Sequence, residues 1–151
     1  MLPESNVQVA ITPISKTNGA TADTTAGLAI DTKGYDYMQL VVFTGTADVV
    51  SDTLSVLKLQ ECDTTVTSSF ADVTGARSGT DFTIATNAYT STTNQNVWMF
   101  RVNLGPPRKR YLAVVASPQT TMVMAAVAML GRAEQAPDSA ANADCLNVVT
   151  L

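Results

Sequence analysis

Short runs of apolar and β-branched residues, separated by turn residues, constrain the fold of this chain more than any other feature. Val, Leu, Thr and aromatic residues dominate each run, and Gly, Pro, Asn or Asp residues bound it, as in β-strands joined by turns. The apolar spacing of an amphipathic helix is nowhere sustained. The clear strand candidates are residues 7–12, 37–44, 54–62, 97–104, 110–116 and 121–130, and the weaker ones are residues 27–30, 70–73 and 81–85.

Alternation within these segments predicts which side chains face the core. In residues 97–104 a large apolar side chain occupies every second position, so one face of this strand should be buried and the other partly wet. In residues 54–62 the same alternation points two leucines inward and leaves Glu61 at the rim of the core. The predicted core residues are Trp98, Phe100, Leu57, Leu59, Val41 and Val114.

Two of the predicted strands, residues 37–43 and 122–129, are apolar on both faces, which is typical of strands that are covered on both sides. Either another part of the chain or a neighbouring subunit should cover the second face. Residues 122–130 also suit a short helix, because Ala and Met are good helix formers. The β-branched Val123 and Val127 favour a strand.

About eight or nine short strands are enough for two packed sheets, so we expect an all-β sandwich in one domain, residues 1–131. Residues 132–151 differ in composition: a polar spacer leads to an apolar tip. We expect an extended C-terminal arm. Its tip either reaches a neighbouring subunit or completes the chain's own sheet as an edge strand. The apolar tip residues are Leu146, Val148, Val149 and Leu151.

The composition argues against enzymatic chemistry. The chain has no His and only 15% charged residues, while Thr takes 22 of its 151 positions. Catalytic triads that contain His and most zinc sites are therefore excluded, and no phosphate-binding glycine loop is present. The remaining catalytic alternative is a pair of carboxylates for glycoside hydrolysis, from Glu61, Asp63, Asp72 and Asp81. We expect no enzyme, cofactor or metal.

The chain shows no sign of membrane insertion or secretion. Its longest apolar run, residues 122–130, is half of the roughly 18 residues that a spanning helix needs. Residues 1–5 do not begin a secretory signal, so we expect synthesis in a cytoplasm. In that compartment Cys62 and Cys145 should remain reduced thiols.

One basic triplet, Arg108, Lys109 and Arg110, stands out in an acidic chain. The net charge of −4 argues against nucleic-acid binding as the main function. The triplet is open to three interpretations: a solvated turn between strands, a docking contact for an acidic patch on a partner protein, or a weak phosphate-binding site. With the apolar tip, Arg108, Lys109 and Arg110 are the candidate partner-binding residues.

Three segments resemble one known family. They are Lys33-Gly34-Tyr35-Asp36 before the strand at residues 37–43, residues 57–63 followed by Phe70-Ala71-Asp72-Val73, and the basic turn that enters the strand at residues 110–114. Together they are similar to the capsid decoration (cement, auxiliary head) proteins encoded among the head genes of tailed bacteriophages. The resemblance implies a jelly-roll-like β-sandwich that assembles as an oligomer over junctions between major capsid subunits.

We therefore expect a structural virion protein on the capsid surface, made in the host cytoplasm. Its expected partners are the major capsid protein and itself, as a homo-trimer or other homo-oligomer, with no direct nucleic-acid or membrane contact. The same features suit a head–tail connector, a tail-tube protein or a receptor-binding module. A carbohydrate-binding β-sandwich is a further alternative, because Tyr89 lies in a polar loop region.

Overall fold

The computed structural model of the chain describes residues 5–16, 29–47, 53–84, 96–105, 107–131 and 147–150. The regular structure of these residues is almost entirely β, with one short 3-10 helix, η1 (Thr67–Ser69). The strands are β1 (Ser5–Lys16), β2 (Ile30–Asp31), β3 (Tyr37–Ala47), β4 (Leu54–Cys62), β5 (Ala71–Arg77), β6 (Asn96–Asn103), β7 (Tyr111–Pro118), β8 (Met122–Gly131) and β9 (Asn147–Thr150). None of the described residues form a helix long and apolar enough to cross a membrane.

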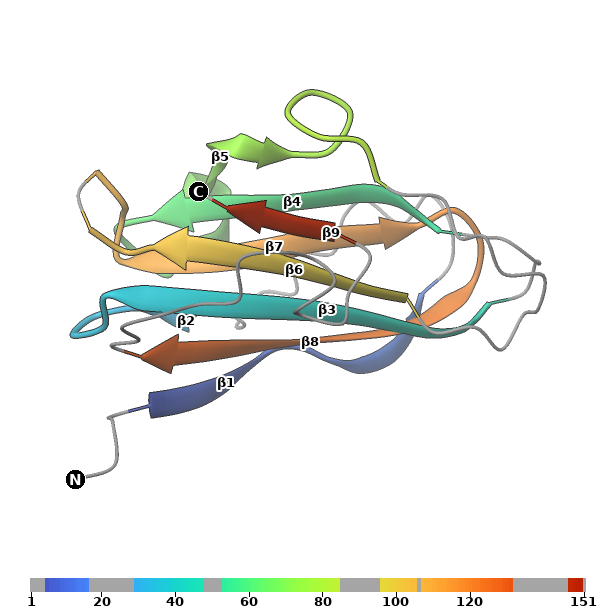
Figure 1. Cartoon of the computed structure of the whole chain (residues 1–151), viewed down its shortest axis with the longest axis horizontal. Helices are drawn as coiled ribbons and strands as arrows, with labels where there is room; N and C mark the ends of the chain where they lie inside the picture. The colour runs from blue at the N-terminus through green and yellow to red at the C-terminus, as the bar shows by residue number, and fades with distance from the viewer. Residues whose placement is uncertain are drawn as a thin grey trace.

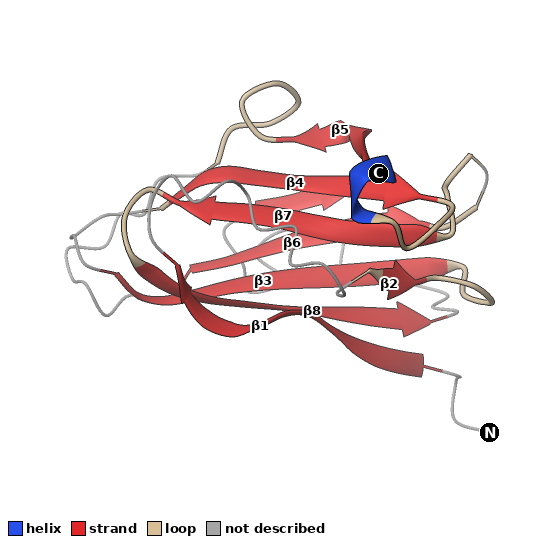
Figure 2. Ribbon diagram, turned by 180° about the vertical axis from the view of Figure 1, so that it is seen from behind, coloured by secondary structure: helices blue, strands red, loops and turns tan. Residues whose placement is uncertain are grey.

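The strands form two sheets packed face to face (Figure 1, Figure 2). Sheet A has the order β1-β8-β3-β6-β9, and sheet B has the order β2-β7-β4-β5. The antiparallel pairs are nested: β1 pairs with β8, β2 with β7, β3 with β6, and β4 with β5. This arrangement of two four-stranded sheets is a jelly roll, to which β9 adds a fifth strand on sheet A. The expected jelly-roll-like sandwich of about eight strands is confirmed.

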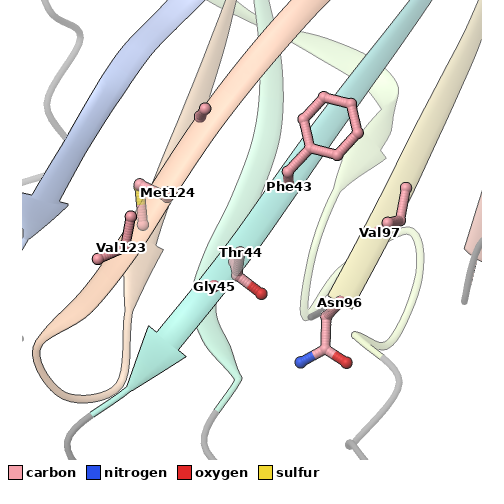
Figure 3. Close-up of a pocket in the computed structure, with 8 residues that line it drawn as sticks. Phe43, Thr44, Gly45, Asn96, Val97, Val123 and Met124 are labelled. Carbon is pink, nitrogen blue, oxygen red and sulfur yellow. The ribbon is translucent and has the colours of Figure 1, made fainter. Parts of the chain in front are cut away.

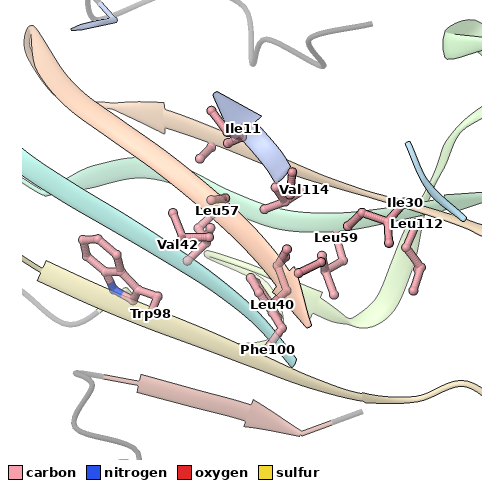
Figure 4. Close-up of a cluster of buried hydrophobic side chains, with 14 of the residues drawn as sticks. Ile11, Ile30, Leu40, Val42, Leu57, Leu59, Trp98, Phe100, Leu112 and Val114 are labelled. Carbon is pink, nitrogen blue, oxygen red and sulfur yellow. The ribbon is translucent and has the colours of Figure 1, made fainter. Parts of the chain in front are cut away.

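The core lies between the two sheets, where the inward positions of both meet (Figure 4). Trp98 and Phe100 come from sheet A and Leu57 and Leu59 from sheet B, and all four are almost completely buried. Phe82, in the turn region after β5, packs edge-to-face on Phe100 with ring centroids 6.0 Å apart. Val114 joins the same core, as predicted.

Val41 does not belong to this core, although it is buried. Its neighbours Leu40 and Val42 point toward sheet B, so Val41 lies on the outer face of sheet A. In register with it on that face are Met99 of β6 and Val127 of β8. The sequence predicted the burial of Val41 but not its side of the sheet, because a strand that is apolar on both faces gives no signal of which face is inside.

The strand assignments hold with one exception. All six clear candidates are strands, including β8, for which a helix was the alternative. Residues 81–84 are not a strand, because Gly79 at φ 77° turns the chain and the amide of Asp81 donates to the Arg77 carbonyl. Phe82 forms only an isolated bridge with Ser78. Residue 85 lies outside the described residues, as do 27 and 28 of the β2 candidate.

The C-terminal tip forms part of sheet A. β9 pairs in parallel with β6, from Trp98 opposite Asn147 to Arg101 opposite Thr150. These four residues therefore form an edge strand of the chain's own sheet, which is one of the two interpretations of the tip. Residues 132–146 and Leu151 lie outside the described residues, so the predicted boundary at residue 131 and contact of the arm with a neighbour stay predictions.

Candidate functional site

The basic triplet lies at one end of sheet B, at a corner where three segments meet. β7 begins there between β2 and β4: Asp31 is in register with Tyr111 on one side, and Cys62 with Tyr111 on the other. Figure 2 shows β2, the end of β4 and the start of β7 at the same end of the sandwich. We call Asp31, Glu61, Arg108, Lys109 and Arg110 the ionic corner.

Arg110 forms a two-pronged ion pair with Asp31. Its Nε donates to Oδ1 of Asp31 at 2.9 Å, and its terminal Nη2 donates to Oδ2 at 2.6 Å. The guanidinium also lies over the Tyr111 ring, 4.9 Å from the centroid. The hydrogen bond from Arg110 lowers the pKa of Asp31 below its usual value and outweighs the opposing effect of desolvation. The pair clamps β2 to the start of β7.

Glu61 contacts the other two residues of the triplet, Arg108 and Lys109. One of its carboxylate oxygens, Oε2, lies 3.6 Å from Arg108 Nη1 and accepts a hydrogen bond from the backbone N–H of Lys109 at 3.3 Å. The Glu61 and Arg108 side chains are mostly buried. Glu61 therefore lies at the rim of the core, as the alternation predicted, and there it offsets one charge of the triplet.

Two of the three cations in the triplet thus have internal carboxylate partners. Within the described residues no carboxylate pairs with the ammonium group of Lys109. The sequence showed no internal partner for the triplet because the acidic partners are far away along the chain: Asp31 and Arg110 are 79 positions apart. Of the three cations in the triplet, Lys109 is the one left for an external partner.

Cys62 lies beside the corner as a buried free thiol. Hydrogen bonds from Thr64, through its hydroxyl and its backbone N–H, lower the pKa of the thiol, and the charge of Lys109 adds to the effect. A reactive cysteine needs a lowered pKa together with solvent access. Cys62 is buried, which favours a structural role. Cys145 lies outside the described residues.

Three of the four carboxylates considered for glycoside hydrolysis each have hydrogen-bond partners of their own. Asp72 accepts from Lys58 Nζ at 2.7 Å and from Gln60 at 2.8 Å, on the outer face of sheet B. Asp81 accepts from the backbone N–H of Arg77, and Glu61 belongs to the ionic corner. In the part of the chain that the structure describes, no group of three or more carboxylate or cysteine residues could hold a metal ion.

Two of the other four predicted contact residues are on sheet A. Val148 and Val149 belong to β9, which runs in the direction of β6 and thus toward the end of the sandwich that holds the ionic corner. Leu146 and Leu151 lie outside the described residues. The two halves of the predicted contact surface therefore belong to different sheets.

Comparison with known proteins does not place the chain in a family. No family model, no curated protein and no solved structure matches it.

Proposed function

We propose that this chain is a structural protein of a virus particle, a decoration protein that binds the surface of an assembled capsid and bridges its major capsid subunits. The observation that carries the proposal is the nested pairing of eight strands into a jelly roll. This architecture recurs in viral capsid proteins. It also serves lectins and cupins, so the fold alone does not assign the function.

The ionic corner adds a second line of support. The three segments that resemble phage decoration proteins are far apart in the sequence. Parts of all three meet at this corner: the turn after Asp31, the end of β4 at Glu61, and the turn from Arg108 to Arg110. Ion pairs and backbone hydrogen bonds fix their positions. A rigid corner built from those segments suits a contact with another subunit.

The chemistry of the corner suits protein binding better than phosphate binding. Asp31 and Glu61 offset the charges of Arg110 and Arg108, and the chain as a whole is acidic. A phosphate backbone requires several unpaired cations. The proposed capsid contact at this corner is therefore Lys109 against an acidic group of the major capsid protein.

The direct test is the composition of the virus particle. Particles of the virus that encodes this chain should carry the protein on the outside of the head, as judged by mass spectrometry and immunogold labelling. Particles made without it should release their genome at a lower temperature. Absence of the protein from purified particles would contradict the proposal. Labelling confined to the tail would favour a connector, tail-tube or receptor-binding protein instead.

A charge reversal tests the contact separately from the function. Lys109→Glu should lower the occupancy of the protein on particles that lack it, and raising the salt concentration should weaken binding of the original protein through the same contact. Arg77→Glu, on β5, makes the same change of charge away from the corner. Equal occupancy of the two variants would exclude the corner as the contact but leave the decoration function standing.

A further inference from the structure

The outer face of sheet A carries most of the exposed apolar surface of the described chain. The described residues include six exposed large hydrophobic side chains, and five of these six lie on the outer face of sheet A. Pairing across the strands places them together, because Val7 of β1 is opposite Met129 of β8, and Phe43 of β3 is opposite Ala125 of β8. The five are Val7, Val9, Phe43, Val123 and Met129.

The two sheets differ in this respect. The outer face of sheet B carries the ion pairs of Asp72 with Lys58 and Arg77. On sheet A the described charged side chain on the outer face is Arg101, which is only 9% exposed. Near β6 the side chains on the outer face of sheet A are buried: Val41 is 6% exposed and Met99 is 7% exposed. The open apolar area therefore covers β1, β8 and the end of β3.

This area has a raised end and a hollow end. Val7, Val9 and Met129 project from β1 and β8 at one end, and we call them the ridge. At the other end a groove of about 220 Å³ lies among Phe43, Gly45, Val97 and Val123 (Figure 3). Gly45 keeps the groove open, because a Cβ there would lie 3.7 Å from Val123.

We propose that the occupant of this face is a second copy of the chain, related by a two-fold axis in the plane of the face. The ridge of each copy then fits the groove of the other, and the contact forms twice, as in any isologous interface. Met129 and Val123 are six positions apart on β8, so ridge and groove lie about 20 Å apart at 3.4 Å per residue. A two-fold axis midway between ridge and groove places the ridge of each copy on the groove of the other copy.

Charge favours a second copy, and area sets the strength of the contact. A surface almost without charge meets no like-charge repulsion when it packs on itself. Two strands about 35 Å long and the end of a third, about 4.8 Å apart, present about 400 Å² of flat area per copy. Pairing then buries about 800 Å² in total, the size of a weak, transient interface. The inference goes beyond the proposed function, because it concerns the isolated protein and needs no capsid.

The test compares the association of single-site variants by sedimentation equilibrium of the full chain. Val7→Lys and Val123→Lys each place a charge in the interface and should weaken dimerisation at least about tenfold. The matched control is Val66→Lys, since Val66 is 56% exposed against 65% for Val7 but lies in the loop before η1. The control should dimerise like the original chain. Thermal melts establish that each variant folds.

A mixing experiment tests the arrangement of the two copies. A Val7→Asp chain mixed with a Val123→Lys chain should form a heterodimer more tightly than either variant pairs with itself, because the new charges then face each other. A chain that stays monomeric at about 1 mM, where even weak contacts are detectable, overturns the proposal. In that case faster labelling of a Val7→Cys thiol after removal of residues 132–151 would identify the chain's own C-terminal segment as the occupant. A trimer, or the absence of rescue on mixing, would contradict the two-fold arrangement.

Discussion

Phe100 is one of the core side chains whose loss should cost the most stability. It is 0% exposed and contacts Phe82 edge-to-face, in the middle of the core between the sheets. Phe100→Ala should lower the free energy of unfolding by about 3–5 kcal/mol, because it removes apolar contacts and leaves a cavity. Urea unfolding measures this loss. Val66→Ala, at an exposed position, should change stability by less than about 0.5 kcal/mol, and an equal effect of the two would place Phe100 outside the core.

The contribution of Asp72, on the outer face of sheet B, to the stability of the fold should depend on pH. The hydrogen bond from Lys58 lowers the pKa of Asp72, so its charged form is favoured in the folded chain. Its contribution to stability is present above the unfolded pKa of about 3.9 and is lost as the pH falls through the lower folded value. Asp72→Asn should therefore cost up to about 1 kcal/mol at pH 7 and nothing at the acid end.

Urea midpoints of the original chain and of Asp72→Asn, measured from neutral to acid pH, test this expectation. The control is Asp63→Asn, since the exposed Asp63 forms no salt bridge with a described residue. A constant difference between Asp72→Asn and the original chain at every pH would show that charge has no part in the effect.

The turn between β2 and β3 depends on a glycine backbone. Gly34 has φ 88°, a conformation that residues with a Cβ avoid, and no atom lies within 4 Å of a Cβ built there. Gly34→Ala should therefore destabilise the fold by about 1–2 kcal/mol through backbone strain alone. Gly45→Ala is the matched control, because Gly45 has no positive φ and the new Cβ would make an ordinary contact with Val123. Equal melting temperatures for the two variants would contradict the strain argument.

β9 contributes one short parallel ladder to sheet A. It has four residues, and all eight strands of the jelly roll precede it in the chain. Deletion of residues 147–151 should therefore leave a folded sandwich and cost about 1–2 kcal/mol, the net value of a few hydrogen bonds after the entropy of ordering the strand. Circular dichroism and urea unfolding measure both expectations. A truncated chain that is unfolded would show that β9 is essential to the sandwich.

The whole molecule should fold slowly for its size. Nested pairing joins β1 to β8 across most of the chain, and β2 to β7 across little less. Contacts so distant in sequence close large loops before they gain any packing energy. Refolding from urea should therefore take milliseconds to seconds or longer by stopped-flow Trp98 fluorescence, as in other β-sandwiches. Submillisecond refolding would contradict this dependence on topology.

The sequence by itself determined most of the strands and, in most of these, the inward face. In β6 the alternation that buries Trp98 and Phe100 is a local property of the sequence, so it can be seen without knowing which strands pair with β6. The same reasoning placed Glu61 at the rim. It did not show that Val41 is buried on the outer face of sheet A, because both faces of β3 are apolar. It also did not decide whether Val148 and Val149 contact a neighbouring subunit or form the edge strand in which they lie.

Only the tertiary structure decided which strands pair, and with that the properties of the surface. The ion pair of Asp31 with Arg110 and the hold of Glu61 on Arg108 depend on β7 lying between β2 and β4. That order follows from packing the whole chain, and residues separated by dozens of positions carry no local sign of it. A triplet that is free in the sequence is therefore largely paired in the fold. The apolar outer face of sheet A arises in the same way, because it exists only once β1, β8 and β3 are neighbours.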